Sequence, residues 1–308
     1  MEQISCIFCK QQNNSVAICQ DGYTGKRCHE CQLIYISPRP TEQTVVNIYG
    51  HDDAQISAQA HIGGSLLKRL YARHTLTLIR RHLPKSKKAE TPSLLEIGSG
   101  AGYFLDEARK KGFSSYAIEL NPIQANFIKQ NLHIPCENSL LSAASFGATR
   151  FDAIYHSDVI SHFYDPVAAF NIMHEKLNAN GLLVFETGNI AEINKDYFPA
   201  FTSFQYPDHL FFFSEHSIKL LLEKTGFELL AIHRYNILPQ LKLLKWLHKP
   251  KQPSTSAQST QTQKNSFIKN AIKNGYYLGS YCLRYKLGAW LPKSERPQTM
   301  IVMARKKD

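Results

Sequence analysis

Three glycines stand at alternate positions in one short stretch, directly after an apolar run and directly before a helical pattern of apolar residues. They are Gly98, Gly100 and Gly102, and the acidic residue Glu96 lies two positions before the first of them. Glycine adopts backbone dihedrals closed to other residues and lets a ligand approach the main chain closely. The dinucleotide fingerprint requires a glycine at position 103, where this chain has Tyr103. The spacing therefore predicts a strand-to-helix turn that binds a nucleoside-type ligand without the dinucleotide fingerprint.

A second carboxylate, Glu119, ends the next predicted strand, 21 residues after the first glycine. An acidic side chain at the end of such a strand can accept hydrogen bonds from both hydroxyls of a ribose. Another interpretation stays open, in which the glycine turn only tightens strand–helix packing and Glu119 is a solvated strand end. The combination of Glu96, the glycines and Glu119 favours ligand binding.

This combination resembles motif I of the class I S-adenosylmethionine (SAM)-dependent methyltransferases. The resemblance implies that SAM is the cofactor and that the glycine loop and the ends of the second and third strands contact it. At the third strand, family spacing indicates Asn138 as the partner of the adenine amine, with the backbone of Ser139 beside it. The cofactor residues that the resemblance implies are Glu96, Gly98, Ser99, Gly100, Gly102, Glu119, Leu120, Asn138 and Ser139.

Four of the seven cysteines form two Cys-x-x-Cys pairs, and 18 residues separate the pairs. Each pair can form a tight knuckle that directs both thiolates at one tetrahedral ion, so the spacing predicts a zinc ribbon. The predicted ligands are Cys6, Cys9, Cys28 and Cys31. Four thiolates leave no open position on the metal, which indicates a structural Zn²⁺. Four free thiols or two disulfides are the alternative.

The segment after the predicted fourth strand is where this fold brings a substrate to the methyl group. Here Asp158, Val159, His162 and the following Asp-Pro resemble a family phrase in which an acid and Val-Leu-Glu-His precede Asp-Pro. Ubiquinone-type O-methyltransferases use the acid, the Glu and the His to hold a divalent metal. Keto-sugar C-methyltransferases, which include members with a similar zinc-ribbon head, use the Glu–His pair for proton chemistry. Because the Glu is Ser161 in this chain, we expect no catalytic metal.

His162 is the first candidate for a general base, since an imidazole titrates near neutral pH and can remove a proton from a hydroxyl, an amine or an activated carbon. Asp158 belongs to the same candidate catalytic group. His209, in a His-Leu-x-x-Phe-Ser phrase that is similar to one in the family, is the second candidate as base or substrate binder. The serine of that phrase, Ser214, is expected to cap the next helix. Alternatively, His162 binds the backbone at a helix start or only orients the substrate.

Strand and helix patterns alternate from residue 93 onward, which predicts an α/β fold with a parallel sheet. Seven expected strands match the doubly wound, Rossmann-like methyltransferase sheet, whose last strand is antiparallel. They are 93–98, 115–119, 133–137, 151–156, 181–187, 227–233 and 299–305. The expected units are a zinc-ribbon-like module (1–50), a SAM-binding methyltransferase domain (65–240), a basic helical insertion with a disordered linker (241–292) and the final strand (293–308).

The net charge of +11 comes mainly from two segments. Residues 54–89 carry eight Lys and Arg residues and 241–291 carry nine, and neither segment contains an acid. Basic segments usually face anions. They indicate an anionic small-molecule substrate or a peripheral membrane contact through 241–291, whereas ordinary solvated helix faces are the alternative.

Together these features predict a SAM-dependent methyltransferase that acts on a small molecule of sugar, lipid or metabolite type. Two alternatives stay open: an RNA methyltransferase with a zinc module, and a non-catalytic SAM-fold scaffold at a membrane surface. Residues 1–53 carry six acids against four Lys and Arg residues, so nucleic acid is the less favoured partner. We expect a cytoplasmic protein, because the chain shows neither a membrane-length apolar run nor a signal-peptide pattern at its start.

Overall fold

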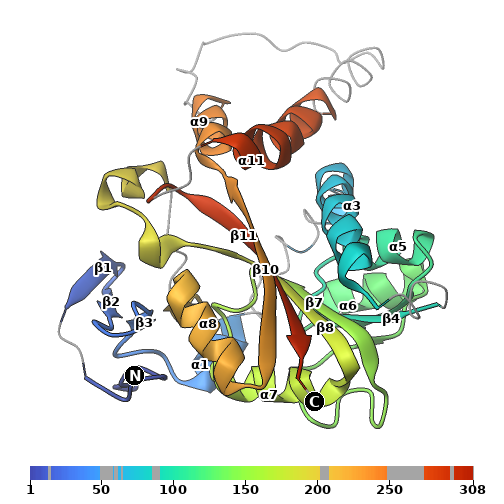
Figure 1. The fold of residues 1–308 in the computed structure, drawn as a ribbon, viewed down its shortest axis with the longest axis horizontal. Helices are drawn as coiled ribbons and strands as arrows, with labels where there is room; N and C mark the ends of the chain where they lie inside the picture. Colours follow the sequence, from blue (N-terminus) through green and yellow to red (C-terminus); the bar gives the residue numbers. More distant parts are fainter. Residues whose placement is uncertain are drawn as a thin grey trace, which may run out of the picture.

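The computed structural model describes residues 1–12, 15–48, 58, 62–63, 65–84, 91–201, 208–247, 274–291 and 295–307 (Figure 1). These residues form a seven-stranded sheet, a four-stranded sheet and the helices around them. The predicted linker around 250–263 lies outside the described residues.

The larger sheet has the strand order β10-β11-β8-β7-β4-β5-β6. Its strands are β4 (Ser93–Ile97), β5 (Ser114–Ile118), β6 (Cys136–Glu137), β7 (Phe151–Ser157), β8 (Leu177–Gly188), β10 (Phe227–Asn236) and β11 (Gln298–Lys306). Strands β6, β5, β4, β7 and β8 run parallel, whereas β11 pairs antiparallel with both β8 and β10. This confirms the predicted sheet. The five parallel strands end on the same side of the sheet, which we call the carboxyl edge.

Helices cover both faces of this sheet. They are α3 (Ser65–His82), α5 (Tyr103–Lys110), α6 (Pro122–Phe127) with the π-helical turn η1 (Ile128–Leu132), α7 (Pro166–Lys176) and α8 (Glu215–Lys224). One hydrophobic cluster contains Leu94 and residues of α3 and α5, and a second contains Leu95 and residues of α7 and α8. Leu94 and Leu95 are neighbours in β4, so the alternation of side chains along a strand directs them to opposite faces.

The smaller sheet contains the N-terminal ribbon and one strand from much later in the chain. Its strands, in spatial order, are β1 (Val16–Gln20), β2 (Tyr23–Arg27), β3 (Ile34–Ile36) and β9 (Phe211–Phe212). The remaining short helices before β9 are α1 (Glu42–Ile48), η2 (Ile190–Glu192) and η3 (Lys195–Ala200). Buried ribbon residues, among them Leu33 and Tyr35, belong to the same hydrophobic cluster as α7 and α8. The ribbon therefore shares the core of the methyltransferase-like sheet.

Residues 237–297 leave the larger sheet after β10 and return at β11. Their described helical parts are α9 (Leu238–Leu247), 274–281, η4 (Cys282–Leu287) and α11 (Gly288–Trp290). The neck of this insertion is closed, since the N–H of Ile237 donates to the carbonyl of Pro297 at 3.0 Å. The insertion packs on α3, where the rings of His74 and Tyr285 stack with centroids 4.1 Å apart. None of the described helices has the length and apolar character that crossing a bilayer requires.

Candidate active site

The three glycines after β4 have positive φ angles of 69°, 55° and 70°. A Cβ on Gly98 would lie 2.6 Å from Cγ2 of Val159, and one on Gly102 would lie 2.8 Å from Cγ1 of Ile128. These two glycines therefore allow close packing inside the protein. A Cβ on Gly100 would meet no atom of the described residues within 4 Å. The middle glycine borders open space, where a ligand can approach the main chain.

The carboxylate of Glu119 is held by main-chain donors on two sides. Its Oε2 accepts from the N–H of Gly100 at 2.6 Å, and its Oε1 accepts from the N–H of Asn121 at 2.8 Å. Burial raises the pKa of Glu119, and the hydrogen bonds from Asn121 and Gly100 oppose that rise. The side chain of Asn121 in turn caps α6 by accepting from two backbone N–H groups. The predicted ribose partner is thus fixed in one orientation by the glycine loop and the start of α6.

Glu96 is 5% exposed, and its Oε2 has no hydrogen-bond partner among the described residues. Burial and the nearby charge of Glu119 raise its pKa well above the ordinary value. Burial lowers the pKa of Lys68 on α3, and the charges of the nearby Glu96 and Glu119 oppose this shift. A buried, unpaired carboxylate oxygen is costly unless a donor or a cation reaches it. This pair of acids beside an open glycine position fits a ligand that carries hydroxyl groups and an ammonium group.

Asn138 follows β6 at the same edge. Its side-chain amide donates to the carbonyls of Glu119 and Leu120, at 2.8 and 2.9 Å. These bonds tie the end of β6 to the end of β5. Ser139 lies next to it and is exposed. All nine predicted cofactor residues, from Glu96 to Ser139, thus follow or end β4, β5 and β6 at the carboxyl edge.

The structure brings the two predicted histidines together. The rings of His162 and His209 meet edge to face, with centroids 4.4 Å apart. Nδ1 of His162 lies 3.7 Å from Oδ2 of Asp208, which the sequence analysis did not single out although it precedes His209. Asp158, directly after β7, adopts a positive φ of 56°, and its N–H donates to the carbonyl of Glu186 at 2.9 Å. The carboxyl edge thus carries a cluster of two imidazoles and nearby carboxylates.

Burial keeps both imidazoles neutral. It lowers the pKa of His209 to about 3, with a contribution from the charge of His162. Burial also lowers the pKa of His162, while the charges of Asp208 and Asp158 oppose this shift. A neutral imidazole can accept a proton. Ligand atoms of His162, Asp208 and His209 also lie within 4.8 Å of one another, a spacing that could hold a metal ion.

Glu186 and Arg284 form an ion pair that the sequence analysis missed. Nη1 of Arg284, from the insertion, donates to Oε1 of Glu186 near the end of β8 at 3.0 Å. Burial raises the pKa of Glu186 to about 7, while Arg284 opposes the rise. Burial also raises the pKa of Asp158, and the charge of Arg284 opposes that rise. The insertion therefore reaches the carboxyl edge through this side chain.

Part of the basic charge on α3 is also paired inside the fold. Arg69 contacts Asp106 and Glu107 of α5, at 2.5 and 2.7 Å, and Arg73 contacts Glu107 at 2.7 Å. These pairs and Glu186–Arg284 neutralise several of the charges that indicated an anionic partner.

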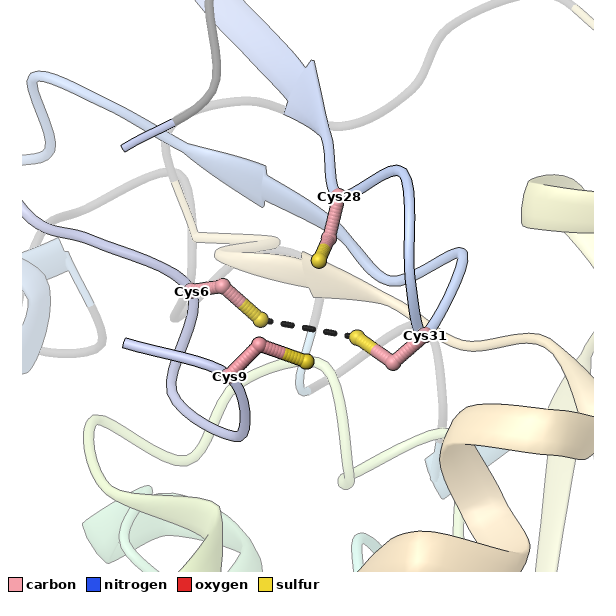
Figure 2. A group of neighbouring side chains, drawn as sticks. All are labelled: Cys6, Cys9, Cys28 and Cys31. Carbon is pink, nitrogen blue, oxygen red and sulfur yellow. Dashed lines mark hydrogen bonds between the residues drawn. The ribbon is translucent and has the colours of Figure 1, made fainter. Parts of the chain in front are cut away.

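The four predicted zinc ligands converge at the ribbon, as Figure 2 shows. Cys6, Cys28 and Cys31 are fully buried, and Cys9 is partly exposed. None of these four forms a disulfide, and the sulfurs of Cys6 and Cys31 lie 3.4 Å apart (dashed line in Figure 2). All four sulfurs lie within 4.8 Å of one another. Four converging thiols of this kind fit a tetrahedral zinc ion.

A comparison with protein-family models matches residues 67–232 to a family described as a methyltransferase domain. The matched residues make up more than half of the chain. The chain belongs to this methyltransferase family. A search of curated proteins finds no match.

Solved structures of methyltransferases share the fold. A Burkholderia thailandensis 1,6-didemethyltoxoflavin-N1-methyltransferase, solved with 1,6-didemethyltoxoflavin and S-adenosylhomocysteine, aligns with a TM-score of 0.52 and 12% identity, over 96% of this chain and 100% of that chain. A Haemonchus contortus phosphoethanolamine N-methyltransferase 2 in complex with SAM aligns with a TM-score of 0.51 and 14% identity, over 89% of this chain and 62% of that chain. At these identities the likeness establishes the class I SAM-dependent methyltransferase fold.

Proposed function

We propose that this methyltransferase uses SAM to methylate a small molecule of sugar, lipid or metabolite type. The observation that carries the proposal is the open position at Gly100 between the fixed carboxylate of Glu119 and the unpaired Oε2 of Glu96. Both solved relatives described above hold SAM or its demethylated product, which supports the same cofactor here.

The residues present fit that cofactor. Glu119 would accept from the ribose hydroxyls, and Glu96 would receive the donor that its buried Oε2 lacks. Asn138 keeps a carbonyl oxygen that could accept from the adenine amine, since its amide nitrogen donates to the backbone. We call Glu96, the glycine loop, Glu119 and Asn138, together with their neighbours Leu120 and Ser139, the cofactor half of the carboxyl edge. Bound SAM supplies a methyl group on a positively charged sulfur, which needs no further activation.

We call Asp158, His162, Asp208 and His209, with the Glu186–Arg284 pair, the acceptor half. His162 would remove the proton of the acceptor as methyl transfer proceeds, because its imidazole is neutral and only partly buried. The carboxylate of Asp208 would favour the imidazolium that forms. His209 packs edge-on against that ring and would limit the orientations open to it.

The charges of the acceptor half favour a neutral or cationic acceptor. Its carboxylates belong to Asp158, Asp208 and Glu186, and its cation, Arg284, already pairs with Glu186. This proposal differs from the sequence-based expectation of an anionic substrate. The two relatives are named for methylating 1,6-didemethyltoxoflavin and phosphoethanolamine, both small molecules.

Calorimetry with SAM and with its demethylated product tests the cofactor assignment. We expect binding by the wild type and at least about tenfold weaker binding by Glu119→Ala, since one hydrogen bond to a charged group contributes about 1.5–3 kcal/mol. Glu223→Ala on the exposed side of α8 is the matched control and should bind normally. No heat from the folded wild type with either ligand would refute the proposal.

Turnover tests the acceptor class. Purified protein, labelled SAM and a fractionated cell extract that contains both small molecules and RNA should give label in a small-molecule fraction. Label that enters only RNA would instead support the alternative of an RNA methyltransferase.

A further inference from the structure

Building on the proposed function, we infer that the ribbon, held by its metal, positions His209 and Asp208 in the acceptor half, so that metal occupancy governs methyl transfer but not SAM binding. The ribbon is a positioning element in this inference, and the reacting groups remain those of the carboxyl edge.

The first observation is the strand ladder between the ribbon and the segment after His209. β9 begins two residues after His209 and pairs with β3, which begins three residues after Cys31. The pairs are Ile34 with Phe212 and Tyr35 with Phe211. In this sheet β9 is an edge strand that pairs only with β3. One short ladder therefore joins a zinc knuckle to a candidate catalytic histidine.

The second observation is the peptide of Leu210, the residue next to His209. Its carbonyl accepts from the N–H of Ile36 in the ribbon at 3.0 Å, and its N–H donates to the carbonyl of Ser161 at 2.8 Å. Ser161 is the neighbour of His162. The main chain of this fully buried residue thus links the ribbon to the loops that carry both histidines.

The third observation joins the knuckle directly to α8. The hydroxyl of Ser214 donates to the carbonyl of Cys31 at 3.3 Å, and the same hydroxyl accepts from the N–H of Ser217 in the capping box of α8. Both Ser214 and Cys31 are buried. The segment from His209 to the cap of α8 is therefore held at both ends by ribbon main chain.

The cofactor half is held by different contacts. The N–H groups of Gly98 and Ser99 donate to the carbonyl of Ile118, and that of Gly100 donates to Glu119. These bonds connect β4 with β5 inside the larger sheet. They should survive when the ribbon loosens.

The metal matters because the ribbon is too small to fold by its own apolar core. Modules of this size usually depend on a metal or on disulfides, and structural zinc supplies folding free energy directly. Without the ion, the four clustered thiols would lose their common partner, β3 would loosen, and β9 would lose its one neighbour among the described strands.

The experiment compares Cys9→Ser with Cys19→Ser. Cys9 is a partly exposed ligand, whereas Cys19 is an exposed cysteine of the same module outside the cluster. For Cys9→Ser we expect loss of bound zinc and a fall in kcat of about 100-fold, the cost of misplacing a reacting group by about 1 Å. We expect SAM affinity to change much less than kcat, because the hydrogen bonds that hold the glycine loop and Glu119 lie inside the larger sheet. Amide exchange should accelerate in β3 and β9 but not in β4 and β5. Cys19→Ser should behave as the wild type.

A second arm uses the wild-type chain, in case Cys9→Ser does not fold. Zinc removed by a chelator and then restored should abolish and restore kcat and the protection of β9, while calorimetry with SAM stays unchanged. Ser214→Ala should lower kcat more than Ser214→Thr, which keeps the hydroxyl.

The outcomes separate cleanly. Unchanged kcat after zinc loss would overturn the inference, and so would a parallel loss of SAM affinity with faster exchange throughout the larger sheet. A wild type that holds zinc but binds no SAM would refute the proposed function instead.

Discussion

The two halves of the carboxyl edge are built from very different lengths of chain. The cofactor half takes its residues from 96–139, one continuous stretch that contains the carboxyl ends of the three neighbouring strands β4, β5 and β6. The acceptor half collects Asp158 and His162, Asp208 and His209, and the Glu186–Arg284 pair from four separate segments between residues 158 and 284. Main-chain groups fix Glu119 in the first half, whereas side chains meet side chains in the second. The difference implies that acceptor preference can change while SAM binding stays constant.

The largest effect that would sharpen this comparison is expected for His162→Ala. Removal of a general base should lower kcat by about 100- to 10,000-fold while SAM affinity stays unchanged. His216→Ala, an exposed histidine on α8, is the control. Steady-state kinetics on both variants measures kcat, and calorimetry measures SAM affinity. Unchanged turnover would remove His162 from the mechanism, and a loss of SAM affinity would erase the distinction between the halves.

Arg284→Met should destabilise the acceptor half next most strongly. Its side chain is 18% exposed and that of Glu186 is 5% exposed, so the change leaves a largely buried carboxylate without its cation, with only the hydroxyl of Tyr285 as a donor among the described residues. Breaking such a pair costs about 3–5 kcal/mol, and partial exposure of Arg284 favours the lower end. Urea unfolding measures the loss. Lys219→Met breaks the more exposed pair with Glu215 and should cost less than about 1 kcal/mol. Equal losses of unfolding free energy in the two variants would contradict a buried, stabilising role for the Glu186–Arg284 pair.

Two glycine variants test whether Gly102 serves internal packing and Gly100 serves ligand binding. Gly102→Ala places a methyl group against Ile128 and should destabilise the fold by about 1–3 kcal/mol. Gly100→Ala meets no protein atom, so it should cost only the backbone strain of its positive φ, about 1 kcal/mol, while it weakens SAM binding. Thermal unfolding and calorimetry separate the two. Normal SAM affinity in Gly100→Ala would show that SAM does not occupy the open space beside Gly100.

The smallest expected effect belongs to Asp208→Asn and is read from a pH profile. His162 acts as a base only when neutral, and burial lowers its pKa below the ordinary 6.5. kcat/KM should therefore rise with pH through that pKa and reach a plateau around neutral pH. The charge of Asp208 raises this pKa, so Asp208→Asn should move the inflection to lower pH and lower the plateau, because the imidazole becomes a weaker base. An inflection that moves to higher pH would contradict the role of Asp208.

The sequence predicted where the residues of the cofactor half lie in the fold, for a physical reason. Backbone dihedrals, glycine spacing and strand ends are local properties, and all nine predicted residues lie at or beside the ends of β4, β5 and β6. The four cysteines were predicted equally well, because metal ligands leave a spacing signal. Their roles in binding SAM and zinc stay predictions until ligand is measured.

The acceptor half was predicted only in part. His162 and His209 stood out through family phrases, but nothing local indicates that residues 47 positions apart have rings in contact. Asp208 carried no signal beyond its place beside His209. Arg284 looked like one more charge in a basic segment, and only the folded chain pairs it with Glu186, 98 residues away. The two-residue strand β9 was similarly hidden, because adjacent phenylalanines are typical of any core.

The closed neck of the insertion suggests how the segment between β10 and β11 could be replaced as a unit. The backbone bond between Ile237 and Pro297 brings the two ends of the excursion together where β10 and β11 already run side by side. A turn of about two to five residues could bridge these ends. Because the insertion packs on α3 and pairs with Glu186, we expect a chain shortened in this way to keep the pairing of β10 with β11 but to lose the stabilisation and the charge that Arg284 brings to the acceptor half.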